Sequence, residues 1–348
     1  MYRYFDRSTM TRALLLGFIL VALSLLGACS EEPEERASAD DLPLAVACAG
    51  GNDSSMLAPT VLASDPHATA EWYLDGHFSV KDLTRFYRRI NYELAAVSIG
   101  AASVPRLLLA RMPADLRQMN DVERRKAMFF ATVLPMALQV NESILRDRRR
   151  VIAMVDCLRR NGDLPPPVRR WLDAMHAQYG TEGNLDRLIR RLDVVPPSLV
   201  LAQAAIESEW GMSQFATAGN ALFGERTYHK TAGMVPDGIG ESARFRVRRF
   251  DTLLQSIETY VFNLNVSYAY EDFRGMREAI RDGGGTLDGH VLAGGLKAYS
   301  ERGADYIADL RTLIRSNSLQ AFDRARLERV NTGATGDSAR GSRRSTEI

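Results

Sequence analysis

One glutamate in this sequence has the surroundings of a proton donor. Apolar residues recur at helical spacing around Glu207: Leu199, Ala202, Ile206 and Trp210. A carboxylate beside Ile206 and Trp210 is poorly solvated, and the negative end of a helix does not stabilise its charge. We therefore expect the pKa of Glu207 to be raised, which suits a general acid.

The flanking residues predict the limits of this helix. Pro196 and Pro197 fit its first turn, and Ser198 can cap its N-terminus. Gly211 can adopt the left-handed conformation that ends a helix. Glu207 is therefore expected in the last turn.

Residues 1–29 have the pattern of an export signal. A positively charged start precedes the apolar stretch 13–26, which is too short to span a bilayer comfortably, and Leu26-Gly27-Ala28-Cys29 follows. This tetrapeptide resembles a bacterial lipobox, which implies that Cys29 becomes the acylated N-terminus; a plain transmembrane anchor or an ordinary cleaved signal is the alternative. Ser30 rather than Asp follows. By resemblance to lipoproteins of double-membrane bacteria, this favours an outer-membrane lipoprotein that faces the periplasm.

The composition indicates an ordinary globular chain with one or two domains. The 348 residues include 44 basic and 43 acidic side chains, and a net charge of +1 gives no general attraction to nucleic acid. The five histidines are not clustered, and no Cys-x-x-Cys or His-Glu-x-x-His motif occurs, so we expect no metal site and no cofactor. Once Cys29 carries lipid, Cys48 and Cys157 remain, either as a disulfide or as two isolated thiols.

Hydrophobic periodicity predicts a mainly α, α+β architecture. Helical spacing marks four segments: 83–94, 122–150, 253–264 and 306–314. The second is expected to be interrupted by Pro135. Alternating arginines and apolar residues predict a small β-hairpin lobe over 225–250, and residues 47–79 show no clear period.

Composition shifts divide the chain after the signal into four parts. Residues 30–46 are acidic and are expected to form a disordered tether. A helical N-terminal region, 47–160, precedes a second folded region, 161–325. The polar residues 326–348 are expected to form a disordered tail.

Four segments resemble one protein family. They occur in order and at compatible spacing: Pro197–Gly211, Gly219–Gly224, Phe250–Glu271 and Leu296–Asn317. The chain is similar to the glucosaminidase domain of Bax-type proteins and, more distantly, to the flagellar peptidoglycan hydrolases of glycoside hydrolase family 73. Ala221 stands where the family usually has a second asparagine. The resemblance implies that 161–325 is a lysozyme-like helical catalytic domain with a small β-hairpin lobe, preceded by a helical region.

The resemblance also implies a substrate and a reaction. It points to peptidoglycan glycan strands, cleaved at the β-1,4 bond between N-acetylglucosamine and N-acetylmuramic acid, although family labels also mention endo-β-N-acetylglucosaminidase and amidase activity. Glu207 would protonate the leaving oxygen. Tyr270 would be a cleft tyrosine that contacts substrate, or else a core residue. A lytic transglycosylase, a muramidase-type enzyme and an inactive wall-binding lipoprotein are the alternatives.

Glycoside hydrolysis usually needs a second carboxylate, which activates water or stabilises the oxocarbenium-like transition state. In the family it comes from the β lobe, where Glu241 is the first candidate and Glu225 and Asp237 are its rivals. If none of them serves, the N-acetyl group of the substrate could assist, or Glu207 could act alone.

Three further residues are candidates for substrate binding. Trp210 and Phe223 could stack on sugar faces, although their helical and turn positions also suit core packing. Asn220 would hold backbone or contact sugar beside the acid. Glu209 lies about 200° around the helix from Glu207 and is expected to face elsewhere.

Overall fold

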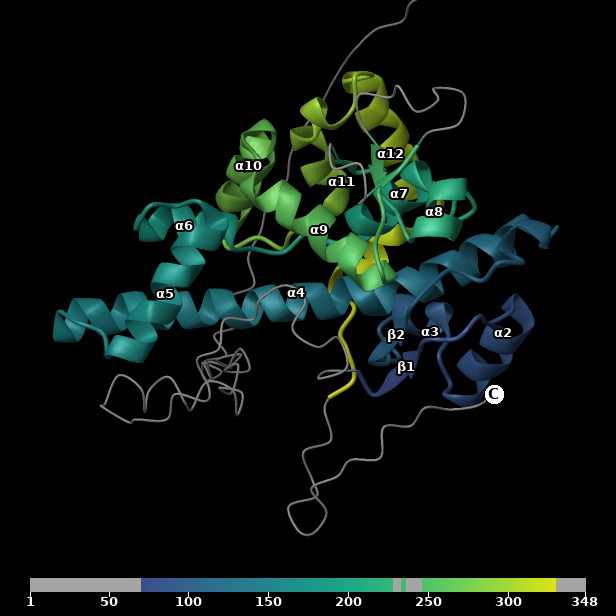
Figure 1. The fold of residues 1–348 in the computed structure, drawn as a ribbon, viewed down its shortest axis with the longest axis horizontal. Helices are drawn as coiled ribbons and strands as arrows, with labels where there is room; N and C mark the ends of the chain where they lie inside the picture. Colours follow the sequence, from purple (N-terminus) through teal and green to yellow (C-terminus); the bar gives the residue numbers. More distant parts are fainter. Residues whose placement is uncertain (1–69, 228–232, 236–245, 330–348) are drawn as a thin grey trace, which may run out of the picture. The chain divides into compact units, whose positions relative to one another are not determined.

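The described part of the chain is mainly helical, with two small sheets (Figure 1). The computed structural model describes residues 70–227, 233–235 and 246–329. The predicted mainly α, α+β fold class is confirmed.

The α-helices are α2 (Val80–Arg89), α3 (Leu94–Ser98), α4 (Val122–Asn161), α5 (Pro166–Tyr179), α6 (Leu185–Arg191), α7 (Pro197–Glu207), α8 (Gln214–Gly219), α9 (Leu253–Val266), α10 (Glu271–Asp282), α11 (Gly289–Leu292) and α12 (Ala304–Ser316). The strands are β1 (Trp72–Leu74), β2 (Leu107–Leu109), β3 (Arg226–Thr227), β4 (Gly233–Met234) and β5 (Arg246–Arg248). The 3-10 helices are η2 (Leu116–Gln118), η3 (Tyr268–Tyr270), η4 (Ala293–Gly295), η5 (Lys297–Tyr299) and η6 (Leu319–Arg324).

The helix that carries Glu207 is buried along almost its whole length. Every residue of α7 from Pro197 to Ala205 is buried, and α4, α11, α12 and η6 all pack against the helix. A helix that is apolar on every face is stable only inside a protein core. The neighbours of α7 therefore determine where its last residue, Glu207, is held.

Helix α4 runs through Pro135 without interruption, so the predicted break there is wrong. The helix spans 40 residues and ends at Gly162 in the left-handed conformation, with φ of 74°. Most of its residues from 128 to 144 are buried, and this packing offsets the hydrogen bond that proline removes. Of the helices described, α4 alone has a stretch long and apolar enough to cross a membrane, but 83% of that stretch is buried inside the protein. It is a core helix.

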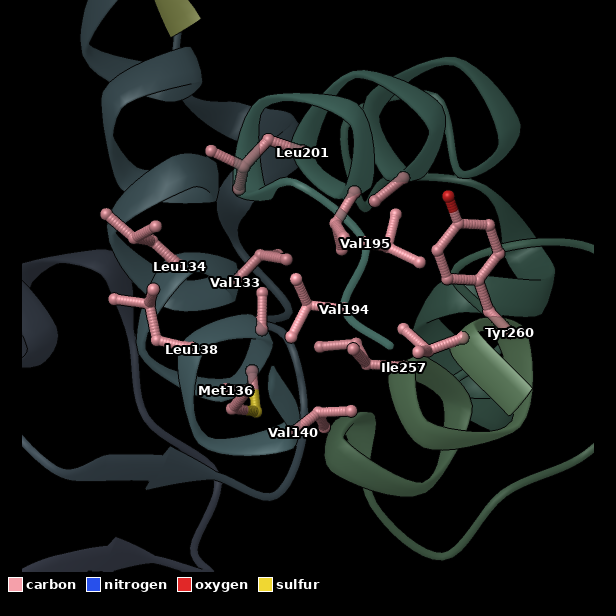
Figure 2. Close-up of a cluster of buried hydrophobic side chains, with 14 of the residues drawn as sticks. Val133, Leu134, Met136, Leu138, Val140, Val194, Val195, Leu201, Ile257 and Tyr260 are labelled. Carbon is pink, nitrogen blue, oxygen red and sulfur yellow. The ribbon is translucent and has the colours of Figure 1, made fainter. Parts of the chain in front are cut away.

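Residues on both sides of position 160 share one core. Figure 2 shows aliphatic side chains of α4 facing side chains from the segment before α7, from α7 and from α9. The labelled residues are Val133, Leu134, Met136, Leu138, Val140, Val194, Val195, Leu201, Ile257 and Tyr260. The described residues belong to one compact unit, and its core contains residues from both sides of position 160.

The N-terminal part contains a short parallel sheet that periodicity did not predict. Strands β1 and β2 pair with Trp72 opposite Leu107. Beside them, Val104 forms a parallel bridge with Leu327, and Arg106 donates to both carboxylate oxygens of Glu142. Strands of three residues are too short to show the alternation of apolar and polar residues that predicts a strand. The bridge places Leu327 beside Val104.

The β lobe is an antiparallel sheet of three short strands in the order β3-β5-β4. Its small core contains Ala221, Val247 and Phe250, with Phe215 and Met234 packed against them. This arrangement agrees with the predicted β element after the glutamate helix.

Several predictions fall on residues outside the described ranges. These are the signal 1–29 with its lipidation site Cys29, the tether 30–46 and most of the tail. Cys48 also lies there. Cys157, its predicted partner, is fully buried at the end of α4 and is disulfide-bonded. The pairing of Cys48 with Cys157 stays a prediction.

A buried arginine fixes the segment that leads into α7. Arg277 of α10 is 1% exposed, and its guanidinium donates to the main-chain oxygens of Asp193 and Val194, at 3.0 Å each, and to Asn265 Oδ1 at 2.8 Å. Burial lowers its pKa to about 10, although the carboxylate of Asp193 opposes that shift. Arg277 therefore remains charged at neutral pH and needs all these acceptors.

Replacing this arginine should destabilise the protein strongly. We expect Arg277→Met to lower the free energy of unfolding by about 3–5 kcal/mol, because it leaves buried main-chain carbonyls and Asn265 Oδ1 without their donor and removes one of the cations that surround the buried Asp193 carboxylate. Urea denaturation followed by circular dichroism measures this. Arg302→Met is the matched control, because its ion pair with Asp309 is exposed and should contribute less than about 1 kcal/mol. Equal losses in the two variants would contradict the role given to Arg277.

Candidate active site

A carboxylate from the C-terminal segment holds the N-terminal end of α7. The N–H and the hydroxyl of Ser198 both donate to Asp323 in η6, at 2.8 Å each, and the N–H of Gly289 donates to it at 3.1 Å. Ser198 is therefore not the N-cap that its sequence position predicts. Pro196 occupies that position without a side-chain cap, and Asp323 accepts the free N–H instead.

The C-terminal end of α7 is a tightly hydrogen-bonded left-handed turn. Glu207 is the last helical residue. The hydroxyl of Ser208 donates to Ala204 O at 2.5 Å and accepts from the N–H of Gly211 at 2.7 Å. Three consecutive residues have positive φ: Glu209 (51°), Trp210 (62°) and Gly211 (77°). The predicted left-handed Gly211 is confirmed, and the two residues before it adopt a conformation that is uncommon outside glycine.

Side chains from the N-terminal region pack against this turn. The ring of Trp210 contacts Phe129 and Phe130 of α4 edge-on, at centroid separations of 5.9 and 5.4 Å. A Cβ on Gly211 would lie 2.8 Å from Met112 Cε and 3.2 Å from Phe129. These contacts favour the core-packing interpretation of Trp210 over sugar stacking.

The Glu207 carboxylate lies among tyrosines. The hydroxyl of Tyr306 in α12 donates to Glu207 Oε1 at 2.7 Å. Burial raises the pKa of Glu207, and the Tyr306 hydrogen bond partly opposes this rise. The predicted direction of the shift is confirmed. The charge of Glu207 in turn helps to raise the pKa of four hydroxyls, those of Tyr260, Tyr270, Tyr299 and Tyr306.

Gln203 connects Tyr306 to a second tyrosine. It precedes Glu207 by four residues and so lies on the same face of α7. Its Nε2 donates to the Tyr306 hydroxyl at 3.0 Å, and its Oε1 accepts from the Tyr260 hydroxyl at 2.6 Å. All three side chains are at most 2% exposed.

Two stacked ring pairs support these tyrosines. Phe223 lies parallel to Tyr260, with 3.9 Å between centroids and 6° between planes. Tyr299 lies nearly parallel to Tyr306, with 5.5 Å between centroids. Phe223 is only 4% exposed, which favours a packing role over the predicted sugar contact.

Tyr270 lies within electrostatic range of two carboxylates. Burial raises its pKa, a hydrogen bond with Asn263 lowers it, and the charges of Glu225 and Glu207 both raise it. Burial also raises the pKa of Glu225 to about 7, against the effect of Arg248, and Glu225 Oε1 has no hydrogen-bond partner. The charges of Glu207 and of Glu225, one of the three predicted second carboxylates, therefore both act on the Tyr270 hydroxyl.

Asn220 has a structural position beside the site. It is 4% exposed and adopts the left-handed conformation with φ of 53°. Its Nδ2 donates to the carbonyls of Phe250 and Asp251, at 3.1 and 3.0 Å. These bonds agree with the backbone-holding alternative and not with sugar contact.

The first choice for the second carboxylate, Glu241, and its rival Asp237 lie outside the described residues. Conversely, no role was predicted for Gln203, Tyr260, Tyr299 or Tyr306. Only Gln203 carried a usable signal, because its spacing of four from Glu207 puts both on one helix face. Within the described ranges, no group of three possible metal-binding side chains occurs.

Comparison with known proteins finds a match over the segments that form this site. Residues 184–319, which include α7, α9 and α12, match the glucosaminidase family model, described as mannosyl-glycoprotein endo-beta-N-acetylglucosaminidase. This part of the chain is therefore similar to glucosaminidase domains. It is also 29% identical to Protein bax of Escherichia coli (strain K12) over 199 residues, which are 55% of this chain and 69% of that protein. The resemblance to Bax-type glucosaminidase-domain proteins is therefore confirmed, and no solved structure matches the chain significantly.

Gly211 gives a direct test of how tightly the turn after Glu207 is packed. We expect Gly211→Ala to destabilise the protein by about 1–2 kcal/mol through its left-handed backbone and by a further 1–3 kcal/mol or so through the clash with Met112. Gly100→Ala is the matched control, because Gly100 has φ of 73° but a Cβ added there would have nothing within 4 Å. Thermal unfolding measures both. A Gly211→Ala protein no less stable than Gly100→Ala would contradict the packing described.

Proposed function

We propose that the glucosaminidase domain hydrolyses the glycan strands of peptidoglycan, with Glu207 as the general acid. The observation that supports this proposal is the environment of the Glu207 carboxylate. The carboxylate stands at the end of a buried helix, its pKa is raised by burial, and one of its oxygens accepts a hydrogen bond from Tyr306. An acid of raised pKa keeps its proton closer to neutral pH and can transfer it to a leaving glycosidic oxygen.

The bond proposed for cleavage is the β-1,4 bond between N-acetylglucosamine and N-acetylmuramic acid. Glu207 would give its proton to the bridging oxygen as the bond to the anomeric carbon breaks. Water then adds to that carbon and gives up a proton, which leaves a reducing N-acetylglucosamine end. The hydroxyl of Tyr270, which lies within electrostatic range of Glu207, is a candidate to contact the reacting sugar.

Glu225 has surroundings that suit the second carboxylate. Its Oε1 is buried without a partner, and its charge acts on the same tyrosine as that of Glu207. A carboxylate with a free oxygen can accept a proton from attacking water. Glu241 and Asp237 in the same lobe remain its competitors.

The cellular location is part of the proposal. The lipobox at Cys29 and the acidic segment after it support an outer-membrane lipoprotein that reaches the wall from the periplasmic side. The disulfide at Cys157 also supports an oxidising compartment outside the cytoplasm.

Glu207→Gln should abolish most of the activity. We expect the rate at which the purified full-length protein digests peptidoglycan to fall by about 100- to 10,000-fold, because glutamine has no proton to transfer at this position. Mass spectrometry of the new chain ends measures the rate and identifies the bond.

Glu209→Gln is the matched control, because this neighbouring glutamate is exposed and should leave the rate unchanged. Ends with 1,6-anhydromuramic acid would identify a lytic transglycosylase. Undiminished digestion by Glu207→Gln, or no digestion by the unaltered protein, would contradict the proposal.

The second carboxylate can be identified by chemical rescue. We expect Glu225→Ala to reduce hydrolysis by about 100- to 10,000-fold, because no base then activates water. Sodium azide should restore part of the rate and yield a glycosyl azide, since azide attacks without giving up a proton. Glu241→Ala is tested in parallel, and rescue of that variant in place of Glu225→Ala would transfer the role to Glu241.

A further inference from the structure

Three buried side chains form a hydrogen-bonded series that ends on Glu207. They come from three helices: Tyr260 from α9, Gln203 from α7 and Tyr306 from α12. The series runs from the Tyr260 hydroxyl to Gln203 Oε1, from Gln203 Nε2 to the Tyr306 hydroxyl, and from that hydroxyl to Glu207 Oε1. Its successive lengths are 2.6, 3.0 and 2.7 Å.

The side-chain amide of Gln203 determines which group donates in each hydrogen bond of this series. An amide oxygen only accepts, and an amide nitrogen only donates. Because Tyr260 donates to Oε1, Nε2 faces Tyr306 and donates to its hydroxyl oxygen. Tyr306 must then direct its own hydrogen to Glu207. A reversed amide would draw that hydrogen toward Gln203 and leave two oxygens facing each other across 2.7 Å.

Packing holds the series in place without substrate. Gln203 is 0% exposed, so water cannot replace either of its partners. Tyr260 is stacked on Phe223, and Tyr306 is stacked on Tyr299. Figure 2 shows Tyr260 at the edge of the aliphatic cluster. The polar ends of the tyrosines therefore meet while their rings are fixed on apolar surfaces.

We infer that Gln203 is a positioning residue which, through Tyr306, reserves Glu207 Oε1 as a hydrogen-bond acceptor and leaves Oε2 as the oxygen that carries the catalytic proton. The inference rests on the proposed function only in calling that proton catalytic. The two oxygens of a carboxyl group exchange roles freely in water. In this protein Oε1 accepts the Tyr306 hydrogen bond, so the two oxygens of Glu207 are no longer equivalent. The glycosidic oxygen must then approach Oε2.

The experiment measures the ionisation of Glu207 directly. Full-length protein is labelled with ¹³C at the glutamate side-chain carboxyl carbon, and the Glu207 signal is assigned by its loss in Glu207→Gln. The Tyr306 hydrogen bond lowers the pKa of Glu207. Tyr306→Phe should therefore raise the pKa of Glu207, and the alkaline limb of the pH–rate profile should move to higher pH. Gln203→Met should also raise the pKa of Glu207 and move the alkaline limb to higher pH, but by smaller amounts.

The double variant separates a positioning role from a merely structural one. If Gln203 acts through Tyr306, Gln203→Met should change nothing further in a Tyr306→Phe background. Gln203→Met alone should lower kcat by about 10- to 100-fold with little change in KM, because the acid is misplaced rather than substrate binding lost. Additive effects, or a Glu207 pKa unchanged in Tyr306→Phe, would overturn the inference.

Two further variants keep the test decisive. Tyr260→Phe removes the donor that orients the amide, and it should reproduce the direction of Gln203→Met if the latter fails to fold. Tyr92→Phe is the control, because the Tyr92 hydroxyl is buried without a partner and its removal should not move the Glu207 titration. If the titration shifts as expected but no variant or parent cleaves glycan, the proposed function fails and the hydrogen-bonded series stands. If the unaltered protein cleaves glycan and the Glu207 titration does not shift in the variants, the proposed function stands and the inference about Gln203 fails.

Discussion

Burial of α7 on every face is the constraint on which the rest of the structure depends. A fully buried helix must find partners for both of its ends within the protein. At its start, Asp323 accepts from the N–H and the hydroxyl of Ser198, and Arg277 binds the carbonyls just before the first turn. At its end, Ser208 ties the last turn to Gly211. The acid is thus held by the packing of a core, not by a surface loop.

The same constraint explains why the N-terminal region belongs to the site. The family match begins at residue 184, yet α4, which lies entirely before it, packs on α7 and α9. Met112 and Phe129 fill the space that a side chain at Gly211 would need, and Phe129 and Phe130 pack against Trp210. The helix that carries Glu207 is therefore partly enclosed by residues from outside the family match.

The sequence was informative wherever local chemistry decides structure. Helical spacing predicted α9 and most of α2, and the apolar residues around Glu207 predicted its place in the last turn and its raised pKa. The same spacing wrongly placed Glu209 and Trp210 in the helix, since α7 ends at Glu207 and both residues are left-handed. Prediction from the sequence failed where residues distant in the chain determine the local structure. Pro135 is tolerated because neighbouring elements pack α4, and Ser198 is satisfied by a carboxylate that lies 125 residues away. The roles of Tyr260 and Tyr306 likewise follow from tertiary contacts, which no local pattern in one sequence contains.

The most direct test of the central claim is a crystal structure of the Glu207→Gln variant with a bound peptidoglycan fragment. The arrangement described here predicts a glycosidic oxygen about 3 Å from the side-chain atom of residue 207 that does not face Tyr306. It also predicts an α7 unchanged from Pro197 to Ala205. A fragment bound away from residue 207, or a residue 207 side chain turned into solvent with Tyr306 unpaired, would contradict the claim.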